Sequence, residues 1–84
     1  MTKFIDREIN VNAYYFAGRE MKTFPKQIEY GNQAITFTNG LRFLIQQGSK
    51  ATRLFDMSAT DGSTYRLRQT GSSWRLLTTK GVQA

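Results

Sequence analysis

The sequence predicts an all-β fold: a small antiparallel meander of six or seven strands, forming either a strongly twisted sheet or a small barrel. Turn-forming residues recur about every eight to twelve positions, and short runs rich in β-branched and aromatic residues lie between them. This spacing is typical of all-β sandwiches and barrels joined by hairpins. The turn formers are Gly18, Gly31 with Asn32, Asn39 with Gly40, Gly48, Asp61 with Gly62, and Gly71.

Taken in order, the runs between these turns give the expected strands. Residues 2–9 favour a short helix instead, because Thr2 can cap a turn ahead of Phe4, Ile5 and Ile9. Pro25, which is the sole proline, indicates the beginning or the edge of a strand. The expected strands cover residues 9–17, 24–30, 34–38, 41–47, 53–57, 64–69 and 73–79.

Two hairpin registers follow from the apolar pattern, because a slip of one residue moves every side chain to the other face. A two-residue turn at Gly31-Asn32 pairs Ile28 with Ile35 and Tyr30 with Gln33. A three-residue loop over residues 38–40 pairs Phe37 with Leu41 and Ile35 with Phe43. The resulting face holds Ile28, Ile35, Phe37, Leu41, Phe43 and Ile45, with Gln27, Thr36, Arg42 and Gln46 opposite.

The stretch STYRLRQTGSSWRLL, residues 63–77, predicts a further hairpin with an unusual charge pattern. A two-residue turn at Gly71-Ser72 places Tyr65, Leu67, Trp74 and Leu76 on one face, with Tyr65 opposite Thr78. The other face then carries Arg66, Arg68 and Arg75, with Arg68 directly across from Arg75. Like charges in this position destabilise a sheet, so an anion is expected nearby. That anion is either an acidic side chain of the chain itself, such as Asp56 or Glu29, or an external phosphate.

Length and composition limit the possible classes of function. At 84 residues the chain, residues 1–84, is expected to form one domain. It has no cysteine and no histidine, so thiol chemistry and histidine-based acid–base chemistry are excluded. The six acidic residues show no spacing typical of a metal site, and the turn ATDGST has too few carboxylates for a calcium loop. We therefore expect no enzymatic activity, no cofactor and no bound metal.

The charge balance points to an anionic partner. The chain has twelve Lys and Arg residues and six Asp and Glu residues, which gives a net charge of +6. Basic side chains interleaved with aromatic ones favour a nucleic-acid-binding module that grips the backbone of single-stranded nucleic acid or RNA. The expected binding residues are the outward arginines Arg42, Arg66, Arg68 and Arg75, which can grip phosphate, and the rings of Tyr14 and Tyr30.

A second interpretation is a protein-interaction or accessory subunit domain without nucleic-acid contact. It would act by adding a strand to a partner's sheet or by homodimerisation, and the polar segment AITFT would then form a poorly protected edge. The chain shows no apolar run of signal-peptide length and no segment near the roughly 20 apolar residues that cross a bilayer. A cytoplasmic protein without membrane contact is expected.

Overall fold

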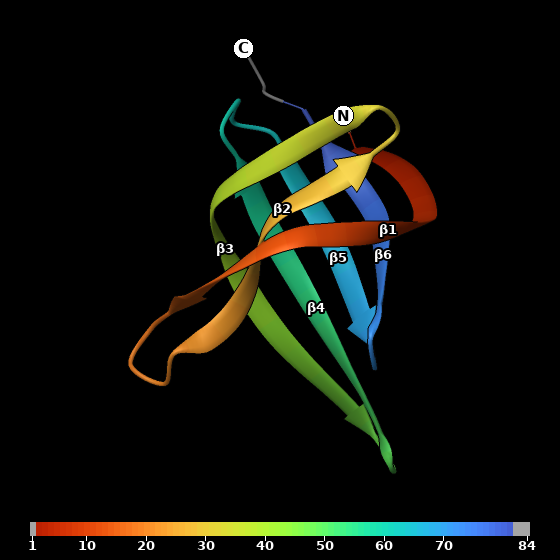
Figure 1. Cartoon of the computed structure of the whole chain (residues 1–84). Helices are drawn as coiled ribbons and strands as arrows, with labels where there is room; N and C mark the ends of the chain where they lie inside the picture. The colour runs from red at the N-terminus through yellow and green to blue at the C-terminus, as the bar shows by residue number, and fades with distance from the viewer. Residues whose placement is uncertain (1, 82–84) are drawn as a thin grey trace.

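The chain folds into a closed six-stranded antiparallel barrel in which each strand pairs with its neighbour in sequence and β1 pairs with β6 (Figure 1). The computed structural model describes residues 2–81. The all-β meander that the sequence predicts is confirmed. The strands are β1 (Thr2–Ala17), β2 (Lys22–Tyr30), β3 (Gln33–Gln47), β4 (Lys50–Ala59), β5 (Thr64–Thr70) and β6 (Ser73–Lys80).

Two long strands close the barrel by changing partner along their length. The first half of β1 pairs with β6 as far as Ile9, and its second half pairs with β2 from Asn10 onward. In the same way β3 pairs with β2 up to Thr36 and with β4 from Phe37. A straight strand of 15 residues would span about 46 Å at ~3.3 Å per residue. β3 is not straight, since it curves around the barrel (Figure 1).

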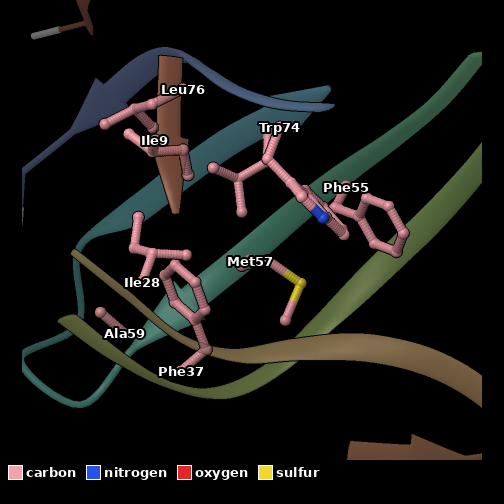
Figure 2. Close-up of a cluster of buried hydrophobic side chains, with 9 residues drawn as sticks. Ile9, Ile28, Phe37, Phe55, Met57, Ala59, Trp74 and Leu76 are labelled. Atoms are coloured by element: carbon pink, nitrogen blue, oxygen red, sulfur yellow. The ribbon is translucent and has the colours of Figure 1, made fainter. Parts of the chain in front are cut away.

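The interior of the barrel is filled by apolar side chains from all six strands (Figure 2). Aromatic rings form much of it: the ring of Phe55 lies 5.1 Å from that of Trp74 and meets the ring of Phe24 edge-on at 6.1 Å. This packing removes apolar surface from water, which is the main force that holds a small domain together. The buried residues of this hydrophobic cluster are Ile9, Ile28, Phe37, Phe55, Met57, Ala59, Leu67, Trp74 and Leu76.

Two of the three predicted hairpin registers are confirmed near their turns. Gly31 and Gly71 both have positive φ, 63° and 60°, a conformation that glycine adopts without strain. Ile28 pairs with Ile35 at the first turn, and Leu67 pairs with Leu76 at the second. The second register slips by one residue further on, because β6 bulges at Leu77. Tyr65 consequently pairs with Thr79 rather than with Thr78.

Two predictions of local structure are wrong. Residues 2–9 form a strand, because pairing with β6 supplies hydrogen bonds that outweigh the local helix preference. Asn39-Gly40 forms no hairpin turn, and the segments predicted as two strands are one strand, β3. The glycine serves close packing instead, since Gly40 pairs with the buried Met57.

The bulge in β3 reverses the faces predicted for its second half. Thr38 is an extra residue between the pairs Phe37 with Ala59 and Asn39 with Ser58. Beyond it, Leu41, Phe43 and Ile45 point outward and are exposed, whereas Arg42 pairs with the core residue Phe55. The predicted apolar face therefore continues only as far as Phe37.

Candidate binding surface

The functional candidates lie on the outer face, which we define as the solvent side of the sheet β3–β4–β5–β6 with the first half of β1. Side chains on this face form rows across the strands, because paired residues stand side by side. The first row runs through Phe43, Leu54, Arg68, Arg75 and Glu8. The second row runs through Leu41, Asp56, Arg66, Thr78 and Phe4. One edge of the outer face is thus apolar and its middle is charged.

The apolar edge is an exposed strip on the β3–β4 hairpin. We call Leu41, Phe43, Ile45 and the paired Leu54 the apolar strip. Leu41 is 63% exposed, and Phe43 and Ile45 are 45% and 43% exposed. Leu44, between Phe43 and Ile45, is also exposed but lies on the opposite face of β3, and the hairpin projects from the barrel here (Figure 1). Single exposed apolar residues are ordinary, but a contiguous group of this kind is characteristic of an interaction surface.

Two of the three outer arginines have acidic partners within the chain. Arg66 donates from Nε and Nη2 to the two carboxylate oxygens of Asp56, at 2.7 and 2.9 Å. Arg75 donates from Nε to Asp6 Oδ1 at 2.6 Å. The anion expected beside the arginines is thus supplied by the protein, in one case by the predicted Asp56. Glu29, the other acid considered, lies on β2 and forms no ion pair in the described part of the chain.

The backbone of β1 brings Asp6 to Arg75. Asp6 lies at the irregularity between Phe4 and Arg7 and has a φ of 51°, a left-handed conformation that aspartate tolerates better than most residues. The hydrogen bond and charge of Arg75, with a smaller contribution from the charge of Arg68, lower the pKa of Asp6. Asp6 therefore carries its negative charge where the facing pair Arg68 and Arg75 needs it.

Arg68 is the outer arginine with the most freedom to meet a ligand. Among residues 2–81 it takes part in no ion pair. It borders a groove between the β3–β4 hairpin and β6, in which the apolar lining comes from Ile45, Leu54 and Leu77. Lys50 is the second cation beside this groove, and no acidic residue lines it. The groove thus combines apolar walls with two basic side chains and no acidic lining.

The other three predicted site residues lie elsewhere. Arg42 does not project from the outer face: its guanidinium lies 5.8 Å from the Phe55 ring, and Nη1 donates to the carbonyl oxygen of Thr23 at 3.1 Å. Tyr14, on the second half of β1, is 48% exposed, with its ring 6.2 Å from that of Trp74. Tyr30 packs against the core. The structure therefore brings together Arg66, Arg68 and Arg75 and separates them from Arg42, Tyr14 and Tyr30.

The apolar strip is the feature that the sequence analysis missed. The predicted register extends from Ile35 and Phe37 into the following segment, and the extra residue at Thr38 shifts that register by one. A signal was present in Phe43, Leu44 and Ile45: three consecutive apolar residues in a strand cannot all face one core.

The described residues contain no helix that could cross a membrane and no group of three or more acidic residues placed to hold a metal ion. Comparison of the chain with models of protein families, with curated proteins and with solved structures finds no match. The case for function therefore depends on the geometry and chemistry of the outer face.

Proposed function

We propose that this chain is a protein-interaction module that binds its partner through the apolar strip on the outer face. One observation carries the proposal: three exposed large apolar residues, Leu41, Phe43 and Ile45, alternate along β3 and so share its outer face. Solvating this much apolar surface costs free energy, which a partner recovers by covering it. Leucine and isoleucine offer little to the stacking bases of nucleic acid, which prefer aromatic rings.

The basic residues beside the strip indicate which side chains a partner would present to it. Lys50 and Arg68 border the groove beside the strip, and the groove has no acidic lining. Arginine beside apolar side chains is a common composition at the centre of protein interfaces. The complementary surface would present apolar side chains to Leu54 and Leu77, with one or two carboxylates reaching Arg68 and Lys50.

A paired variant experiment tests this function. In Leu41→Thr/Ile45→Thr the strip loses two of its four apolar side chains, and threonine still suits a strand. Phe16→Thr is the control, since Phe16 is 61% exposed on the separate β1–β2 hairpin. In a pull-down, we expect the wild type to capture a partner protein at both physiological and high salt. The Phe16→Thr variant should capture the same protein, and the double variant should not. The captured protein, once purified, should bind with at least about tenfold lower affinity to the double variant.

The proposal fails if every captured protein binds the wild type and the double variant equally. It also fails if capture disappears at high salt, because an apolar contact persists when charges are screened. Both variants should first show the far-ultraviolet circular dichroism of the wild type, so that loss of binding reflects the surface and not the fold.

A second candidate function, binding of single-stranded nucleic acid, is favoured by the neighbouring Arg68 and Arg75 in the same row as the exposed ring of Phe43. A phosphate could bind at Arg68 while a base stacks on Phe43. The internal partners Asp56 and Asp6 reduce the charge available for this role.

Fluorescence anisotropy of labelled single-stranded DNA, single-stranded RNA and duplex, titrated from low to physiological salt, tests the second candidate. Nucleic-acid binding predicts that Arg68→Ala weakens the affinity and reduces the salt slope by about one phosphate contact. Asp56→Asn should strengthen binding, because it releases Arg66 from its carboxylate partner. Absence of binding at low salt would exclude this candidate.

A further inference from the structure

The change of partner along β3 leaves a long unpaired strand edge. From Thr38 to Gln47 one side of β3 pairs with β4, and within residues 2–81 no strand pairs with its other side. The backbone groups on such an edge can accept another strand. At the lower end in Figure 1, β3 and β4 extend away from the rest of the barrel.

The opposite edge, on β2, is blocked by features that the β3 edge lacks. Residues 22–25 of β2 pair with β1 alone, and this edge contains Pro25, which has no backbone donor. Arg42 donates to the carbonyl oxygen of Thr23, and Lys26 Nζ donates to the carbonyl oxygen of Phe37 at 3.0 Å. The side chains of Lys26 and Arg42 thus connect β2 and β3 near the point where the two strands stop pairing.

Beyond Arg42 this protection ends. Residues 43–47 have the sequence FLIQQ, with no proline and no charge, although charged residues and proline are the usual protection of an exposed edge. Leu44 is 59% exposed, and the flanking Phe43 and Ile45 are also exposed. An unprotected apolar edge is the usual template for strand addition.

We propose that this edge binds a second copy of the chain, with the two β3 strands pairing antiparallel about a twofold axis at Leu44. The inference rests on the proposed function, because it uses the same exposed segment of β3, but it places the second copy at the backbone edge of that strand, beside the groove that contains Arg68 and Lys50. In this register Phe43 stands opposite the second copy's Ile45, and Leu44 stands opposite its own counterpart. Arg42 stands opposite Gln46, so no like charges face each other across the strands.

The self-complementarity of the edge is the reason to choose a second copy over an unrelated strand. Each apolar residue from 43 to 45 meets an apolar residue, and the single charge between 41 and 47 meets a neutral amide. Seven paired residues on each side bury less than about 1,200 Å², the lower end of specific interfaces. The dimer is therefore weak, with a dissociation constant on the order of 10 μM.

Sedimentation equilibrium of the purified chain tests the dimer. We expect the mass to rise from the 9.6 kDa of one chain toward twice that value as the concentration passes ~10 μM. Leu44→Lys and Leu44→Glu each place like charges opposite each other at the axis and should each weaken the dimer by at least about tenfold. An equimolar mixture of the two variants pairs lysine with glutamate and should restore association.

Phe16→Lys is the matched control, because Phe16 is as exposed as Leu44 but lies on the β1–β2 hairpin. It should dimerise like the wild type. A wild type that stays monomeric at ~200 μM overturns the dimer, as do Leu44 variants that associate like the wild type or whose mixture stays monomeric. A monomeric wild type that still captures another protein through Leu41 and Ile45 would refute the dimer alone. Dimerisation with no strip-dependent capture of another protein would leave the second copy as the partner.

Discussion

Replacing Gly40 with alanine should destabilise the barrel, because the backbone of β3 lies against the core residue Met57 there. A Cβ atom at this position would lie 2.9 Å from the carbonyl oxygen of Asp56 and 2.7 Å from Cε of Met57, with Sδ of Met57 nearer still. Real Cβ atoms essentially never approach other heavy atoms within 3.0 Å. Met57 is fully buried and pairs with Gly40, so it cannot swing into solvent.

The magnitude follows from two opposing effects. Overpacking of a filled core costs about 1–3 kcal/mol, and a contact with rigid backbone belongs in the upper half of that range. Alanine also restricts the unfolded chain relative to glycine, which returns about 0.4–1 kcal/mol. The φ of Gly40 is not positive, so no further backbone strain is added. The expected net loss is about 2 kcal/mol, or a fall in Tm of roughly 8–16 °C for a domain of this size.

Urea unfolding followed by the fluorescence of Trp74 provides the assay, since this is the sole tryptophan and it is buried. Gly81→Ala is the control: a Cβ there meets nothing within 4 Å, so the variant should be at least as stable as the wild type. In a Met57→Ala background two of the three contacts disappear, and Gly40→Ala should cost about 1 kcal/mol less. A loss below ~0.5 kcal/mol, or an equal loss in both backgrounds, would refute the close approach of β3 to the core.

Three further predictions concern the polar contacts. Arg42→Met removes the hydrogen bond to the Thr23 carbonyl and the contact with Phe55, and should lower the free energy of unfolding by about 1–2 kcal/mol. The control, Arg19→Met in the exposed β1–β2 turn, should change it little. Equal urea midpoints for the two variants would contradict a stabilising role of Arg42. The pKa of Asp6 is lowered from 3.8 in the fold, so its contribution to stability is present above that pH and lost as the pH falls below it. Thermal unfolding between pH 2 and 7 should therefore show a smaller acid loss in Asp6→Asn, which tolerates the same φ, and parallel curves would show that the ion pair with Arg75 is unimportant. The exposed pair Arg66 with Asp56 should give a coupling of only about 0.2–1 kcal/mol in a double-mutant cycle, and a coupling well above that range would mean that the pair is shielded from water.

The hairpin turns show which structural features the local sequence predicts. Glycines with positive φ at Gly31 and Gly71 define tight turns, and the apolar residues next to them determine the register as far as Ile35 and Leu76. The same signal at Asn39-Gly40 predicts a turn that does not form. A glycine supports either a turn or a close backbone approach, and only the presence of Met57 opposite it decides between them.

The candidate surface likewise has one part that the sequence predicts and one part that only the structure shows. Alternation along residues 64–69 and 73–79 places Arg66, Arg68 and Arg75 on one face, and the structure agrees. Their acidic partners are less accessible to prediction, because Asp6 reaches Arg75 from 69 positions away through an irregularity in β1. Asp56, on the neighbouring strand β4, is one of the two acids that the sequence analysis names, beside Glu29 and an external phosphate.

The sequence by itself determined the class of fold, the positions of most turns, the core face of the last hairpin and the absence of cysteine and histidine chemistry. These properties depend on composition and on short-range alternation, which a strand expresses with a period of two residues. Only the tertiary structure decided where β1 and β3 change partner and insert an extra residue. A single bulge reverses the face of every following side chain, which is why the apolar strip and its unpaired edge could be recognised only in the folded barrel.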